Sequence, residues 1–296
     1  MSAGATAVSS LVGVVLVVIA FRDIFDSLFH PEGRAAVGRL VSRAVWVTVR
    51  RLGRGRPRVA GLAGPLVLVA VISTWALLLI VGWALIYLPH VNTGFDIPQN
   101  VGGGDLVNAL HISLNGLTTL GASDAIAEPG WLRIVNPLEA LVGFGLLTAS
   151  VSWLLLVYPA LGRRRSLAYE LSLLLREEEE TGTSLVDLEP VVAERVYADL
   201  TDRLIAVERD FVNFPVSYYF TEGDPRFSLA SSLPYALDLA RRGTSGDTPN
   251  SVRLRARMLE EALGDLAATT AHRFHRAPGE SAEDLLHAYA RDQPEP

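Results

Sequence analysis

The sequence contains no cysteine and no lysine. Without cysteine the chain has no disulfide, no thiolate metal site and no cysteine nucleophile. All 26 basic residues are arginine, which excludes a lysine nucleophile, a Schiff base and a P-loop lysine. No catalytic triad is visible, and His272 and His275 lack a nearby carboxylate for zinc. We therefore expect no enzyme, no catalytic residue, no metal site and no organic cofactor, and a membrane-anchored enzyme in the second half is the least favoured hypothesis.

Charged residues make up only 20% of the chain, against 50% hydrophobic residues, and they are unevenly spread. The first 160 residues contain ten arginines and eight acids, a net charge of +2. The remaining residues contain sixteen arginines and twenty-four acids, a net of −8, and the two parts sum to −6. An acidic second half argues against a nucleic-acid partner.

Three long apolar runs lie in the first half. A bilayer span needs about 20 apolar residues. Residues 59–88 carry no charge, and residues 134–159 carry only Glu139. Residues 3–21 are also uncharged, and we expect a retained span rather than a cleaved signal peptide, because no basic residue precedes the run and charged residues follow it at once. The runs predict an all-α integral membrane protein with the lipid bilayer as a partner.

The arginines predict the orientation of these spans. Nine arginines lie in residues 22–58 and three more in residues 163–165, whereas residues 90–133 contain one arginine and four acids. The positive-inside rule places 22–58 and 163–296 in the cytoplasm and 90–133 outside. We therefore expect a multi-pass protein of the plasma membrane with a cytoplasmic C-terminal domain.

Both cytoplasmic stretches show helical patterns. Residues 35–52 have an apolar face flanked by arginines, which predicts either a helix on the inner leaflet or a solvated basic linker. The aromatic, turn-rich stretch 218–225 is either a ligand or docking site or part of the bundle's packing, so an unknown cytoplasmic ligand stays an open hypothesis. Residues 163–296 are predicted to form an α-helical bundle. Its helices are expected over residues 166–180, 187–212, 228–242, 251–275 and 281–291.

Between the second and third runs lies a segment too short to cross the membrane. Residues 105–118 predict a helix capped by Asp105, and at about 1.5 Å per residue it reaches only halfway through a bilayer. Residues 118–124 show no helical pattern. Bare backbone at membrane depth is tolerated only where it is packed in protein or lines a water-filled path. A span, a half-helix, an irregular strand and another span therefore predict a pore.

With these residues the chain resembles the potassium-channel pore-loop family over roughly residues 60–160, and 105–159 is similar to that family's pore helix, filter and inner helix. The resemblance implies a homotetramer in which backbone carbonyls replace the water shell of monovalent cations, K⁺ and also Na⁺, without any other cofactor. The residues similar to the family's Thr-Thr-Val-Gly-Tyr-Gly-Asp filter are Thr118, Thr119, Leu120, Gly121, Ala122, Ser123 and Asp124.

The resemblance also divides the chain into three predicted domains. Residues 1–58 form an N-terminal span and a basic segment. Residues 59–162 form the potassium-channel-like pore module. Residues 163–296 form the C-terminal cytoplasmic helical bundle, which resembles no regulatory domain known to us.

Two filter residues depart from the family pattern. Ala122 replaces the aromatic residue that braces the filter, and Ser123 replaces the second glycine, where a Cβ in a left-handed conformation costs about 1 kcal/mol or more. Gly121 is expected to supply the first left-handed position. We expect a softer upper filter and weak selectivity among monovalent cations. The alternatives are a strictly potassium-selective channel and a non-conducting sensor or scaffold that kept the pore fold.

Residues beside the filter are predicted to support it. Asn115 is placed to hydrogen-bond the filter backbone, or to be satisfied by a neighbouring subunit or water. The resemblance places Glu139 behind the filter as structural support, and Gly143 or Gly145 where the inner helix bends. His111 is expected to pack in the interior.

Further polar residues have two interpretations each. Asp124 and Glu128 either concentrate cations at the outer mouth or cap local amides. Thr148, Ser150 and Ser152 either line the inner cavity or bond back to their own helix.

Overall fold

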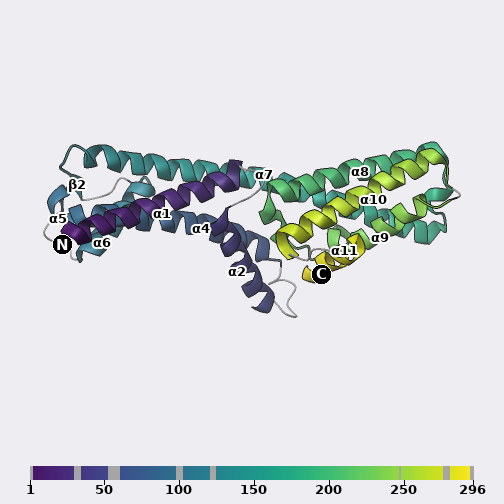
Figure 1. Ribbon diagram of the computed structural model, residues 1–296, viewed down its shortest axis with the longest axis horizontal. Coiled ribbons are helices and arrows are strands. Elements are labelled where there is room, and N and C mark those ends of the chain that lie inside the picture. The colour runs from purple at the N-terminus through teal and green to yellow at the C-terminus, as the bar shows by residue number, and fades with distance from the viewer. Residues whose placement is uncertain are drawn as a thin grey trace. The chain divides into compact units, whose positions relative to one another are not determined.

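The computed structural model describes residues 3–29, 35–52, 61–97, 103–120, 125–246, 248–275 and 281–293. Within these ranges the regular structure is helical apart from one pair of two-residue strands (Figure 1). The chain forms two compact units. The membrane unit comprises Met1–Ser42 and Leu68–Leu155, and the C-terminal unit comprises Arg43–Val67 and Leu156–Pro296.

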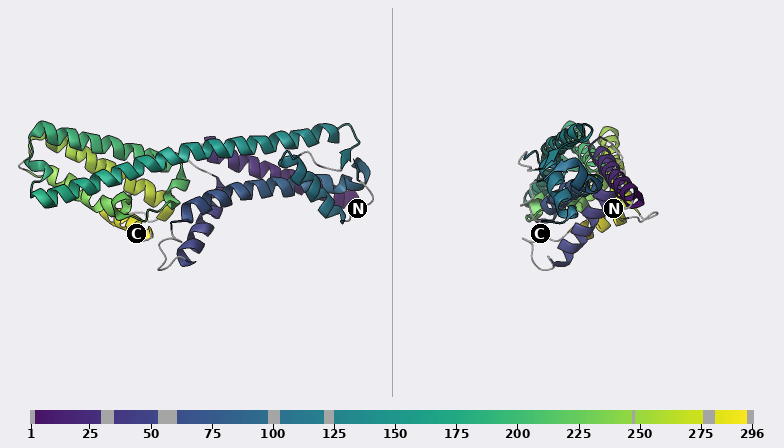
Figure 2. Two further views of the ribbon diagram at one scale, coloured as in Figure 1. Left: turned by 180° about the vertical axis from the view of Figure 1, so that it is seen from behind. Right: turned by 90° about the vertical axis from the view of Figure 1, so that its left-hand side faces the viewer.

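Three helices of the described chain are long and apolar enough to cross a membrane. They are α1 (Ala3–Phe29), α4 (Ala63–Tyr87) and α7 (Leu132–Thr181). Two short helical turns, η1 (Leu88–His90) and α5 (Val91–Gly94), continue α4. The three predicted apolar runs are thus confirmed as helices. The third run continues into the predicted helix 166–180 without a break, as Figure 2 shows from behind. Leucine, alanine, arginine and glutamate dominate this continuation, and they favour an unbroken helix.

Two glycines let α1 and α4 approach each other closely. A Cβ on Gly13 would lie 2.5 Å from the carbonyl oxygen of Gly82, and a Cβ on Gly82 would lie 2.8 Å from Cγ2 of Val17. Nearby, the Ser9 hydroxyl donates to the carbonyl oxygen of Leu85 at 2.8 Å. Small residues at a crossing bring membrane helices into close van der Waals contact. In this structure α1 is therefore a packed helix of the membrane unit.

We expect Gly13→Leu to destabilise the membrane unit by about 1–3 kcal/mol, because the added side chain must displace the α4 backbone. Thermal unfolding of the purified protein in detergent measures this effect. Gly4→Leu is the matched control, since a Cβ at Gly4 meets no atom within 4 Å. Equal melting temperatures for the two variants would contradict the close crossing.

Among its described residues, the C-terminal unit contains four further helices, which are α8 (Pro190–Asn213), α9 (Leu229–Gly243), α10 (Asn250–Thr270) and α11 (Ala282–Asp292). Shorter turns connect them, namely η2 (Leu185–Asp187), η3 (Pro215–Tyr219), η4 (Pro225–Phe227) and the π-helical turn η5 (Ala271–His275). The helices predicted for residues 187–291 are thus all present, with ends shifted by a few residues. Helix α8 begins later than expected because Pro190, with its fixed φ, suits a first helical turn.

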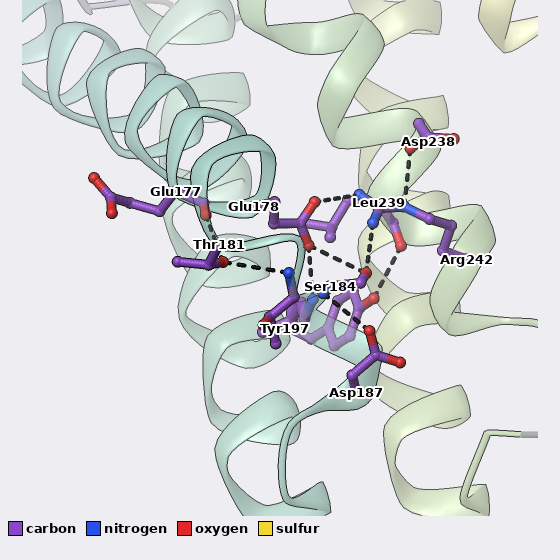
Figure 3. Close-up of polar contacts among 11 residues, drawn as sticks. Glu177, Glu178, Thr181, Ser184, Asp187, Tyr197, Asp238, Leu239 and Arg242 are labelled. Atoms are coloured by element: carbon purple, nitrogen blue, oxygen red, sulfur yellow. Dashed lines mark hydrogen bonds and ion pairs between the residues drawn. The ribbon is translucent and has the colours of Figure 1, made fainter.

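A polar cluster joins the end of α7 to η2, α8 and α9 (Figure 3). Arg242 donates from Nη2 to Glu178 Oε2 at 2.8 Å and from Nη1 to Ser184 Oγ at 2.5 Å. The Tyr197 hydroxyl donates to the carbonyl oxygen of Leu239 at 2.9 Å, and burial raises the pKa of Tyr197 to about 12. These bonds are made within the bundle, so the cluster fastens one end of the C-terminal unit.

An aromatic core lies at the centre of the same unit. Tyr218 stacks on Phe274 with ring centroids 3.8 Å apart, and it meets Tyr289 at 5.7 Å and Phe211 at 6.4 Å. Its hydroxyl donates to Asp292 at 2.5 Å, and burial raises the pKa of Tyr218. Tyr218, Tyr219 and Phe220 are all buried, which favours core packing for these three aromatic residues. A ligand of the 218–225 stretch stays a prediction.

Candidate functional site

Within the membrane unit, two short paired strands close the base of the stretch between α4 and α7. Strand β1 (Phe95–Asp96) pairs antiparallel with β2 (Ile126–Ala127), with Phe95 opposite Ala127. Beside this pair the Glu128 amide donates to the carbonyl oxygen of Gly94 at 3.0 Å. The stretch between the strands is thus a loop whose two ends are tied together.

Within this loop, α6 (Asp105–Leu117) packs back along α4, close to α5 in Figure 1. Buried Ala109, near the start of α6, clusters with Val91, and buried Leu117, at its end, clusters with Leu79. Residues 79 and 91 are twelve positions apart, which is about 18 Å along a helix. Helix α6 therefore follows α4 for roughly half the thickness of a bilayer's hydrocarbon core.

The end of α6 meets α7 at Gly143. A Cβ on Gly143 would lie 1.7 Å from the carbonyl oxygen of Leu117, so only glycine permits this approach. Gly143 is eleven residues beyond Leu132, which packs with Phe95 at the base of the loop, and this spacing is about 16 Å along a helix. Both neighbouring helices thus place the end of α6 near mid-span. A Cβ on Gly145 would meet no atom within 4 Å, and the bend at either glycine stays a prediction.

Helix α6 ends in a left-handed turn. Thr119 has φ 55°, its amide donates to the Gly116 carbonyl at 3.1 Å, and the Leu120 amide donates to the Asn115 carbonyl at 3.2 Å. This is the Schellman pattern, in which glycine usually takes the left-handed position. The expectation that Gly121 is the first left-handed residue is wrong, because the last helical carbonyls are satisfied by a turn that comes earlier. A non-glycine residue in this conformation costs about 1–2 kcal/mol.

The structure describes three of the seven predicted filter residues. Thr118, Thr119 and Leu120 are all exposed in the single chain, Leu120 to 70%. The Thr118 hydroxyl donates to the Leu114 carbonyl at 2.6 Å. The other four predicted filter residues lie outside the described residues, and their roles stay predictions. They are Gly121, Ala122, Ser123 and Asp124.

Behind this turn a buried carboxylate connects α4, α6 and α7. Glu139 is 0% exposed and accepts hydrogen bonds from the Tyr87 hydroxyl at 2.7 Å and the Ser113 hydroxyl at 2.6 Å. A buried carboxylate is very unfavourable unless donors satisfy it. These contacts show that Glu139 joins three helices, and its support of the filter stays a prediction. Sequence reasoning missed Tyr87 and Ser113, although a lone charge in a span is a signal to search for polar partners in the neighbouring spans.

We expect Glu139→Gln to destabilise the membrane unit by about 1–2 kcal/mol, because the amide offers one acceptor oxygen where the carboxylate offers two. Thermal unfolding of the purified protein in detergent is the measurement. Glu128→Gln, at an exposed position between β2 and α7, is the control and should leave the melting temperature unchanged. A Glu139→Gln protein as stable as this control would contradict the role of the carboxylate.

Two expectations near the loop are wrong. Asp105 does not cap α6, because Gly104 occupies the cap position and the Asp105 carboxylate accepts from Asn92 Nδ2 at 3.0 Å. His111 is exposed on α6 rather than packed in the interior of the chain. The Asn115 amide donates to the His111 carbonyl at 2.9 Å on its own helix, and its contact with the filter backbone stays a prediction.

The hydroxyl groups of α7 bond back to their own helix. Thr148 donates to the carbonyl of Phe144 at 2.9 Å, Ser150 to that of Leu146 at 2.7 Å, and Ser152 to that of Thr148 at 2.9 Å. Ser150 is buried within the chain, so the hypothesis that it lines a cavity is wrong. Thr148 and Ser152 are exposed and keep that predicted role.

Sequence reasoning also missed a second buried carboxylate, at the end of the first apolar run. Asp23 is 4% exposed and accepts from the amides of Val37 at 2.8 Å and Gly38 at 2.9 Å, and from Trp75 Nε1 at 2.8 Å. Both amides belong to the first turn of α2 (Ala36–Leu52), so Asp23 satisfies donors that this helix end leaves unpaired. The predicted helix over 35–52 is confirmed. An acid next to a span was visible in the sequence, but its partners depend on the tertiary fold.

Two consecutive arginines attach the second half of α7 to the helical bundle within the C-terminal unit. Arg163 donates twice to the Asp210 carboxylate, at 2.8 and 2.6 Å. Arg164 is 4% exposed and donates to the carbonyl oxygens of Ser217 and Phe220, both at 2.7 Å. The bundle is therefore hydrogen-bonded to α7 just after the apolar stretch of that helix.

Comparison with known proteins adds one relative. The chain is 26% identical over 159 residues to the uncharacterized membrane protein YdjJ of Bacillus subtilis (strain 168). The aligned stretch covers 53% of this chain and 46% of that relative. The chain thus spans less than half the length of the relative it matches. No family model matches the sequence, and no solved structure matches it. The three apolar helices and this relative define the class: the chain is an all-α membrane protein.

Proposed function

We propose that the chain is one subunit of a homotetrameric channel for monovalent cations, with a pore module like that of potassium channels. The observation that supports the proposal best is the course of α6. This helix runs about half a bilayer thickness along α4 and ends at mid-span against Gly143, and the loop that contains it starts and ends at the β1–β2 pair.

A half-span helix needs a polar environment at its end. Backbone groups that follow α6 at membrane depth must be satisfied by protein or by water. In the single chain Thr118, Thr119 and Leu120 are exposed, so the proposal requires further copies of the chain to surround them. Each chain supplies one such strand, and four strands around an axis form a ring of carbonyls that replaces an ion's water shell.

The proposal includes weak selectivity, because Ala122 and Ser123 replace the aromatic residue and glycine that the potassium-channel filter requires. Strict potassium selectivity is the alternative. The proposal also places the protein in the plasma membrane with the C-terminal unit in the cytoplasm, following the arginine distribution. Because Arg163 and Arg164 are hydrogen-bonded to the bundle, a movement of the bundle would move α7 and so open or close the pore.

Ion flux from liposomes tests this function. The purified full-length protein is reconstituted with K⁺ inside, and K⁺ efflux is followed after addition of a proton carrier. We expect efflux above that of empty liposomes, and reversal potentials in K⁺/Na⁺ gradients that show permeation by both ions. Gly121→Pro should abolish efflux, while Gly130→Ala, where a Cβ meets no atom within 4 Å, should not.

The replaced filter residues favour a second candidate, a non-conducting sensor or scaffold that kept the pore fold. Flux equal to that of empty liposomes, from protein shown to be folded and tetrameric, would overturn the channel and favour this candidate. A reversal potential set by K⁺ alone would keep the channel and overturn weak selectivity.

A further inference from the structure

Protein contacts fix the rotation of α2 about its own axis. At its start, Asp23 accepts from the amides of Val37 and Gly38. In its second half, Trp46 is 5% exposed, and its ring centroid lies 5.6 Å from that of Tyr219. The face of α2 that contains Gly38, Ser42, Trp46 and Val49 is therefore turned toward protein.

The opposite face of α2 is apolar and basic. Leu40 is 71% exposed, and Ala44 and Arg51, which follow it at helical spacing, are exposed as well. Arg43 lies at the edge of this face and is also exposed. Helix α2 contains four arginines and no acidic residue. An exposed apolar stripe with arginines beside it is the pattern of a helix that lies in a membrane interface.

The position of α2 along the chain agrees with this pattern. Arg22 and Asp23 follow the uncharged part of α1, so Asp23 marks the edge of the hydrocarbon core. Because Asp23 holds the first turn of α2, that helix begins at the same edge. Near that edge Arg39, in the first turns of α2, is within reach of lipid phosphates, and Leu40 is within reach of acyl chains.

We propose that the outward face of α2, formed by Leu40, Arg43, Ala44 and Arg51, binds anionic phospholipids of the adjacent leaflet. Charge complementarity selects this occupant, since the face offers cations and no carboxylate. The same face of a second copy would bring arginine against arginine. The proposal does not depend on ion conduction, and a non-conducting protein would bind the lipids equally.

The absence of cysteine makes a direct test simple. A spin label is attached to the full-length Leu40→Cys protein in vesicles of phosphatidylcholine with or without phosphatidylglycerol. With phosphatidylglycerol present, we expect the label to be accessible to oxygen and shielded from a water-soluble nickel complex. A label on Leu254→Cys, which is 62% exposed on α10, is the control and should stay accessible to nickel.

The double variant Arg43→Gln, Arg51→Gln in the labelled protein tests the headgroup contacts. We expect it to need about fivefold more phosphatidylglycerol per arginine removed for the same shielding. The pair Arg195→Gln, Arg257→Gln, exposed on α8 and α10, should need no more than the parent protein. Nickel accessibility at Leu40 equal to that at Leu254 would overturn the proposal. The proposal would also be overturned if the label were shielded from nickel to the same extent without phosphatidylglycerol and without the two arginines. Spin–spin coupling between the labels at position 40 of two chains would overturn it as well.

Discussion

Gly143→Ala should destabilise the membrane unit by about 3 kcal/mol or more, at the upper end of the range for overpacked sites. The new methyl group would lie 1.7 Å from the carbonyl oxygen of Leu117, a backbone atom that no rotamer change can move. Helix α6 must therefore shift away from α7. Thermal unfolding in detergent measures the loss of stability, and liposome flux tests whether the proposed ion conduction is lost with it.

Gly145→Ala is the matched control two residues along the same helix. A Cβ there meets no atom within 4 Å, and alanine is favoured over glycine in a helix by about 1 kcal/mol. We expect unchanged or slightly higher stability. If both variants unfold alike, α6 does not end against Gly143, and the half-span helix on which the channel proposal rests is wrong.

Arg164→Ala should destabilise the C-terminal unit by about 2–5 kcal/mol, because each buried acceptor left without a donor costs about 1–3 kcal/mol. The substitution leaves the carbonyl oxygens of Ser217 and Phe220 buried without the guanidinium that donates to both. Thermal unfolding and limited proteolysis of the full-length protein measure the effect. Arg164→Lys should recover only part of the stability, because a single ammonium cannot match the fork of a guanidinium.

Arg165→Ala is the control for that experiment. The Arg165 side chain is 47% exposed and pairs with Glu222 at 2.8 Å, and exposed ion pairs contribute about 0–1 kcal/mol. We expect a correspondingly small change in melting temperature. Similar losses at both arginines would show that Arg164 acts as an ordinary surface charge rather than as a buried link between α7 and the bundle.

Most of the helices could be predicted from the sequence, because their patterns are local. Uncharged runs of about 20 residues require helices in a bilayer, and α1, α4 and α7 follow them. The short helix predicted over 105–118 is present as α6 and ends at Leu117. The bundle helices follow the spacing of their apolar residues in the same way.

The contacts that position the candidate site could not be predicted, because they join residues far apart in the chain. Glu139 was identified as a supporting residue, but Tyr87 lies 52 positions and Ser113 26 positions away from it. Asp23 likewise needs Trp75, also 52 positions away. No single-sequence pattern relates such positions. The left-handed Thr119 was missed for a different reason, since a β-branched residue is an unusual choice for that conformation.

The β1–β2 pair has a consequence for how this part of the molecule varies. Because Phe95 and Ala127 lie opposite each other in a ladder, the stretch between them behaves as an insert on a closed base. We therefore expect that residues added or removed on either side of α6 within this insert leave the register of α4 and α7 unchanged. Transplanting the whole insert from a distant homologue should therefore leave the flanking helices in place, so long as a hydroxyl remains opposite Glu139 and α6 still ends against Gly143.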